Sequence, residues 1–220
     1  MDKLRVLRNN RVFTLLTIFS VIGIFFIIPD VSATEALKED NKHVRTWNKF
    51  ASDTLALHKK LTAGKNITVK NKTGGYAHSK DFYLEKSYYN NNRLISKVQW
   101  EKDNPEQLHT IDVYIHDATG RVIRDFSAAY LPFYHNAPTQ TLISFHHYNG
   151  QLHAFRSFDA SGDRIIEGCS GKDKKGQKIN FILDEDELYE ESDGFMLSAE
   201  YKQCFDGLTQ DKPGKYIIPQ

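Results

Sequence analysis

The chain of 220 residues has only two cysteines and lacks the short motifs that mark common enzyme classes. It contains no G-x-S-x-G nucleophile elbow, no H-E-x-x-H zinc motif and no dinucleotide fingerprint. Its glycine- and lysine-rich stretch 171–178 does not have the spacing of a phosphate-binding loop. We therefore expect a protein without enzymatic activity, and we assign it no cofactor.

An excess of charge of one sign is also lacking. The chain has 29 basic and 28 acidic residues, which gives a formal net charge of +1. A chain so close to neutral has no electrostatic footprint for nucleic acid or anionic lipid, which argues against both as partners. Seven acids do gather between Asp184 and Asp193, but their spacing fails the calcium-binding EF-hand loop. A solvated acidic loop is expected there.

Residues 1–33 have the organisation of an export signal. A basic stretch with four Lys and Arg residues precedes an uncharged run of 17 residues, Val12 to Ile28. The run is long for the apolar part of a signal peptide, about 7–15 residues, and short for a membrane span, about 17–25 residues. Pro29 ends the helix, and Val31-Ser32-Ala33 places small residues at the −1 and −3 positions that signal peptidase needs. This favours cleavage after Ala33, with an uncleaved membrane anchor as the alternative.

Either alternative places the remaining chain outside the cytoplasm, because basic residues stay on the cytoplasmic side. The protein is then periplasmic or secreted, or it is tethered through residues 12–28 to the inner membrane and faces outward. Cleavage changes the formal charge from +1 to −1, because it removes four basic and two acidic side chains. In an oxidising compartment the two cysteines predict a disulfide, Cys169–Cys204, that ties the last strands to the C-terminal helix.

The rest of the chain predicts one α+β domain. In residues 34–64, apolar side chains recur at steps of three and four from Val44 to Leu61, the pattern of an amphipathic helix. Residues 65–80 are polar and predict a linker with at most a short strand. Within 65–220 the period then changes to two, and a second, shorter helix follows at Phe195–Phe205. About eight strands are expected: Phe82–Tyr89, Leu94–Trp100, Thr110–His116, Val122–Ser127, Thr141–Tyr148, Gln151–Phe158, Arg164–Cys169 and Lys178–Leu183.

Short turns join these strands, so neighbours must run antiparallel in a curved sheet built as a meander of hairpins. One turn sequence occurs twice, as Asp117–Ile123 and Asp159–Ile165, and Asn149-Gly150 is a strong two-residue turn signal. Over residues 109–169 the chain resembles the YD-type hairpins of RHS-like repeat proteins, although with two irregular copies in place of an array. The resemblance implies hairpins and no chemistry. The order of elements also resembles periplasmic lipoprotein-sorting carriers and cystatin-like binding domains, in which a helix crosses a half-barrel sheet.

Strand histidines suggest one candidate site. If Asn149-Gly150 closes a two-residue hairpin, His146 lies opposite His153 with β-carbons about 4.5–5.5 Å apart. Two imidazoles at that spacing can share a transition-metal ion, and Glu167 on the next strand could complete the site. The alternative is an ordinary cross-strand pair on the sheet surface.

An aromatic loop suggests a second site. Residues 128–138 are apolar and carry two prolines, so they cannot form an ordinary central strand. They form either a lid over the core or an exposed recognition surface. The candidate binding residues are Tyr130, Phe133, Tyr134 and His135.

The sequence thus predicts an exported, non-enzymatic binding or accessory protein of the bacterial envelope. Its partner would be another envelope protein or an apolar small ligand. Two alternatives stay open: a metal-binding protein that uses His146 and His153, and a periplasmic carrier of an apolar ligand.

Overall fold

The computed structural model describes residues 42–130, 138–190, 192–208 and 219. The chain divides into Met1–Ser32 and Ala33–Gln220, and every described residue belongs to the second part. The predicted export signal, residues 1–33, lies outside the described residues. None of the helices in the described ranges is both long and apolar enough to cross a membrane.

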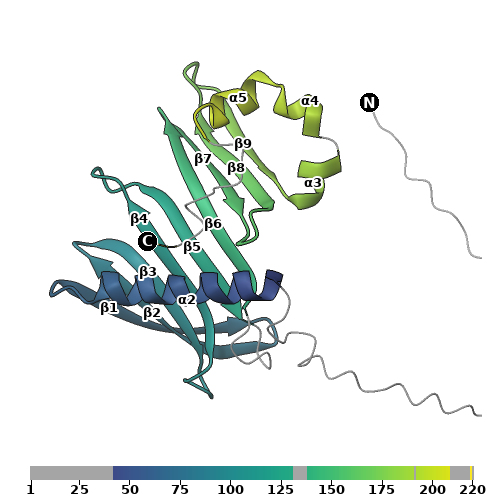
Figure 1. The fold of residues 1–220 in the computed structure, drawn as a ribbon. Helices are drawn as coiled ribbons and strands as arrows, with labels where there is room; N and C mark the ends of the chain where they lie inside the picture. The colour runs from purple at the N-terminus through teal and green to yellow at the C-terminus, as the bar shows by residue number, and fades with distance from the viewer. Residues whose placement is uncertain (1–41, 131–137, 191, 209–218, 220) are drawn as a thin grey trace, which may run out of the picture. The chain divides into compact units, whose positions relative to one another are not determined.

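A single curved, open sheet of nine strands forms most of the described fold (Figure 1). The strands follow one another in chain order and each pairs antiparallel with the next, so the predicted meander of hairpins is confirmed. Their bounds are β1 Ile67–Tyr76, β2 Ser79–Asn90, β3 Arg93–Glu101, β4 Leu108–His116, β5 Val122–Tyr130, β6 Pro138–Asn149, β7 Leu152–Phe158, β8 Arg164–Lys172 and β9 Lys178–Leu183.

Helix α2 (Lys42–Thr62) crosses the sheet and contacts β4, β5 and β6, and three short helices follow β9. These are α3 (Glu185–Glu190), α4 (Ser192–Met196) and α5 (Ala199–Phe205). The predicted α+β class is therefore confirmed. The single C-terminal helix expected at 195–205 is two helices: α4 ends at Met196, and Ser198 caps the start of α5 by accepting a hydrogen bond from the Tyr201 amide.

Two local predictions were wrong. β1 occupies the segment expected to be a linker, and it escaped detection because it is an edge strand with most side chains exposed, including Lys70 and Lys72. The expected acidic loop begins with helix α3. Its first turn forms a capping box, in which the Glu187 amide donates to Asp184 and the Asp184 amide donates to Glu187.

Both groups of helices pack on the same face of the sheet, which we call the helix face. Phe158 of β7 belongs to the core under α2, and Ala154 of the same strand belongs to the core under α5. Residues an even number of positions apart in a strand share a face, so the two cores lie side by side on one surface. We call the opposite surface the open face.

The core under α5 contains the predicted disulfide and a buried ionic network. Cys169 of β8 and Cys204 of α5 are bonded, which confirms their pairing. Arg156 Nε donates to Glu167 at 2.8 Å, and the Tyr201 hydroxyl donates to the same carboxylate at 2.7 Å. Arg164 adds an ion pair at 2.7 Å, while Arg156 and Glu167 are fully buried. This network joins β7, β8 and α5.

The repeated aspartate turns have the predicted hairpin geometry, and the structure adds a third copy. Asp117, Asp159 and Asp173 each begin a turn that ends on a glycine with positive φ. In each copy the aspartate carboxylate accepts a backbone amide hydrogen bond within the turn. The turn at 173 connects β8 to β9.

We predict that Glu167→Ala lowers the free energy of unfolding by about 3–5 kcal/mol, because it leaves Arg156 buried without a counter-charge. Urea denaturation at pH 7 measures the change. Glu185→Ala, at an exposed position in α3, is the control and should change stability by less than about 0.5 kcal/mol. Equal effects of the two substitutions would show that the buried ion pair is not needed for stability.

Candidate functional site

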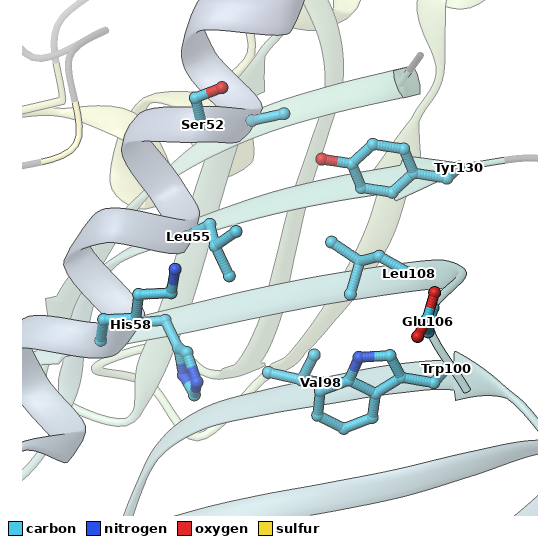
Figure 2. A pocket seen from close by; sticks show the side chains of 10 residues that line it. Ser52, Leu55, His58, Val98, Trp100, Glu106, Leu108 and Tyr130 are labelled. Atoms are coloured by element: carbon cyan, nitrogen blue, oxygen red, sulfur yellow. The ribbon is translucent and has the colours of Figure 1, made fainter. Parts of the chain in front are cut away.

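A groove of about 480 Å³ lies on the helix face between α2 and the sheet (Figure 2). Residues of α2 form one wall, and residues of β3, β4 and β5 form the floor. The lining residues are Ala51, Ser52, Leu55, His58, Lys59, Val98, Trp100, Glu106, Leu108 and Tyr130.

The floor is apolar because of the register of three strands. Val98 and Trp100 are two residues apart in β3 and so share the helix face. Leu108 of β4 pairs with Trp100, which brings a second large apolar side chain beside the indole. Figure 2 shows Leu55 of α2 above this floor. The result is a continuous apolar surface that is open at its edge.

Tyr130 closes the floor at the end of β5. Its side chain is only 7% exposed, and Figure 2 shows its hydroxyl pointing toward α2 across the groove. Within the described residues this hydroxyl has no hydrogen-bond partner. Burial raises the pKa of Tyr130 to about 12. The group is therefore a neutral phenol at physiological pH.

His58 lines the groove, and its tautomer can be deduced from its hydrogen bond. The Ser96 hydroxyl donates its only proton to the Asp112 carbonyl, so its oxygen must accept from His58 Nδ1, 2.8 Å away. Burial, followed by the charge of Lys59, lowers the pKa of His58. The ring is thus neutral near pH 7 with its proton on Nδ1, and Nε2 carries the free lone pair.

Charged groups occupy the rim. Lys59 and Glu106 are exposed and carry opposite charges. The Lys86 ammonium lies 5.4 Å from the centre of the Trp100 ring, which adds a cation–π contact to the groove wall.

Tyr130 is the one candidate residue of the predicted aromatic loop that the structure describes, and it lines this groove. Phe133, Tyr134 and His135 lie outside the described residues. Sequence reasoning did not identify Trp100, Leu108 and His58 as site residues. For Trp100, the sequence showed that it shares a strand face with Val98. That pattern predicts a buried side chain, but it does not predict an empty space beside it.

The predicted histidine pair lies elsewhere, on the open face. The predicted register was wrong: Tyr148 pairs with His153, and His146 pairs with Phe155. The turn residues are Gly150 and Gln151, and positive φ falls on Gly150. His146 and His153 are nevertheless diagonal neighbours, and His146 Nδ1 lies 2.9 Å from His153 Nε2.

The geometry of this pair is that of a shared proton. The rings are within 13° of parallel with centroids 5.1 Å apart. This separation exceeds the N···N distance by about two ring radii, so the rings lie end to end and the nitrogens face each other. A chelated metal ion instead needs lone pairs that converge on a third point. The Asp125 carboxylate, 2.5 Å from His146 Nε2, accepts from the other side of that ring.

Glu167 does not join these histidines. It pairs with Arg156, two positions from Ala154 on the helix face, whereas His153 lies on the open face. Within the described ranges, no group of three or more His, Cys, Asp or Glu side chains is arranged to hold a metal ion.

Comparisons with known proteins were made for the whole chain. No protein-family model and no curated protein matches it. Among solved structures, it is similar to a DUF3836 family protein from Bacteroides vulgatus ATCC 8482, with a TM-score of 0.30 and 13% sequence identity. The match covers 46% of this chain and 92% of that one. A similarity of this size carries no argument about function.

The two regions differ in what they offer a ligand. The histidines of the open face already bond to each other and to Asp125. The groove has an apolar floor and a phenol hydroxyl, that of Tyr130, which has no hydrogen-bond partner in the described part of the chain. The groove is therefore the stronger candidate for a binding site.

We predict that acid destabilises the protein as the pH falls below about 6.5. Burial lowers the pKa of His153, with a further contribution from His146, and burial also lowers the pKa values of His58, His109 and His116. Below the ordinary histidine pKa of about 6.5 the unfolded chain takes up protons that the native state resists. The stabilisation is thus complete above that pH and is lost as the pH falls toward the native pKa values.

The measurement is the denaturant midpoint at pH 7.5 and at pH 5. His153→Gln, which cannot titrate, should show a smaller fall than the unmodified protein. The matched control is His78→Gln at an exposed position. If His153→Gln and the control lose equal stability on acidification, His153 does not contribute.

Proposed function

We propose that this protein is an exported, non-enzymatic binding protein that holds an apolar small ligand in the groove between α2 and strands β3–β5. The observation that carries the proposal is the groove itself, with about 480 Å³ of space over Val98, Trp100 and Leu108. Ligand sites in proteins are typically about 300–1,000 Å³, mostly apolar, with a few polar groups that fix orientation. The groove has this composition.

Its construction also supports a preformed site. Another side of α2 is anchored by Phe50 and Leu57, which are at most 5% exposed and do not line the groove. The helix is therefore held over the floor by packing that does not involve the open space. A preformed site costs little ordering free energy when a ligand enters.

Export is supported by the signal-like organisation of residues 1–33 and by the Cys169–Cys204 disulfide, since disulfides persist in oxidising compartments. A disulfide-bonded fold is compatible with a location outside the cytoplasm. The apolar-ligand hypothesis is the one of the sequence-based alternatives that the groove favours.

We predict that the purified protein binds the uncharged fluorescent probe N-phenyl-1-naphthylamine with a stoichiometry of one, and that Ser52→Trp abolishes this binding. Ser52 lines the groove from an exposed position on α2, so an indole there fills the space without entering the core. Fluorescence titration measures the binding.

Lys60→Trp is the matched control, since Lys60 is exposed on the same helix and does not line the groove. It should bind the probe as the unmodified protein does, and both variants should keep the free energy of unfolding within about 0.5 kcal/mol of the unmodified protein's value. Absence of probe binding, or equal binding by Ser52→Trp, would refute the proposal.

A further inference from the structure

We infer that the ligand is an uncharged amphiphile, with an apolar chain and one neutral group that accepts hydrogen bonds, such as a hydroxyl or an amide. This inference rests on the proposed function, because it names the ligand class for the same groove. It follows from the polar atoms that line the groove.

The first of these atoms is the Tyr130 hydroxyl. The side chain is more than nine-tenths buried, and in the described part of the chain the hydroxyl has no partner. Figure 2 shows it directed across the groove and not toward the rim. A ligand that accepts the proton of this hydroxyl gains a hydrogen bond, and with it affinity and orientation.

A second donor lies on the same floor. The Trp100 indole N–H makes no hydrogen bond within the described residues, and Figure 2 shows the nitrogen on the ring edge that faces Leu108. Indole nitrogen can only donate. The two donors together call for an acceptor oxygen on the ligand.

A hydroxyl or an amide oxygen can accept a hydrogen bond from either of these donors, whereas an ammonium cannot accept one.

The charges of the lining residues also favour an uncharged ligand. Among the lining residues, all of which the structure describes, the formally charged ones are Lys59 and Glu106, and both are exposed. A charged ligand group beside Tyr130 would therefore be buried without a buried counter-ion, which is strongly unfavourable. The Lys86 ammonium over Trp100 further opposes a cation.

The test is displacement of bound N-phenyl-1-naphthylamine at pH 8 by 1-decanol, decanoate and decylammonium, which have the same chain length. We expect 1-decanol to displace the probe at a concentration about tenfold or more below that of either ion. Displacement by an ion at an equal or lower concentration would overturn the inference.

A substitution separates the hydrogen bond from simple hydrophobicity. Tyr130→Phe removes only the hydroxyl and should weaken 1-decanol binding about fivefold to tenfold. Trp100→Phe, which removes the indole N–H together with part of the ring, should act in the same direction and serves if the first variant does not fold. Tyr114→Phe, on the open face, is the control and should leave the affinity unchanged.

Unchanged 1-decanol affinity in both Tyr130→Phe and Trp100→Phe would overturn the inference. The failure of the proposed function has a different signature, because then the naphthylamine probe itself does not bind, or Ser52→Trp still binds it.

Discussion

The packing of Phe50 against Phe126 fixes the position of α2, on which the groove depends. The two rings have centroids 6.2 Å apart, and both side chains are almost completely buried. Thr54 and Leu57 lie on the same side of the helix and are buried with them. Leu55 and Ser52 lie beyond this contact and line the groove. Because α2 packs tightly against the sheet along one side only, a space remains between its other side and strands β3–β5, and this space is the groove.

The second constraint is that one face of the sheet carries two cores. The α2 core covers the middle strands, and the disulfide-linked α5 core covers β7 to β9. Arg156 and Glu167 lie in the second core, fully buried, with Tyr201 completing their hydrogen bonds. A buried ion pair of this kind requires complete partners. It therefore specifies how α5 sits on the sheet, at a distance from the groove.

Much of the fold could be predicted because its pattern is local. The α2 periodicity gave its bounds within two residues, and the alternation in β4 marked one of its faces as buried. β1 could not be found in this way, since an edge strand with both faces exposed has no alternation. The turn at Asp173 repeats the Asp-x-x-Gly pattern of Asp117 and Asp159, so its signal was present in the sequence.

Less of the candidate site could be predicted from the sequence. The Cys169–Cys204 pairing could be predicted because the chain has only two cysteines. The register of β6 and β7 could not, because it depends on which position of the turn the positive-φ residue Gly150 occupies. The groove depends on how far α2 lies from β3, and no residue pattern states that distance. Trp100 and Leu108 have the composition of core residues, so only the packing shows that space remains above them. Tyr130 was predicted for its aromatic loop and lies in the groove for a different reason, its place at the end of β5.

The central claim is that the space between α2 and β3–β5 holds a neutral amphiphile. Intermolecular nuclear Overhauser effects between bound 1-decanol and the protein test it most directly. The account predicts cross-peaks from the decanol methylene protons to the rings of Trp100 and Tyr130, and none to Tyr114 or His153 on the open face. Cross-peaks to the open face in the absence of any to Trp100 and Tyr130 would contradict it.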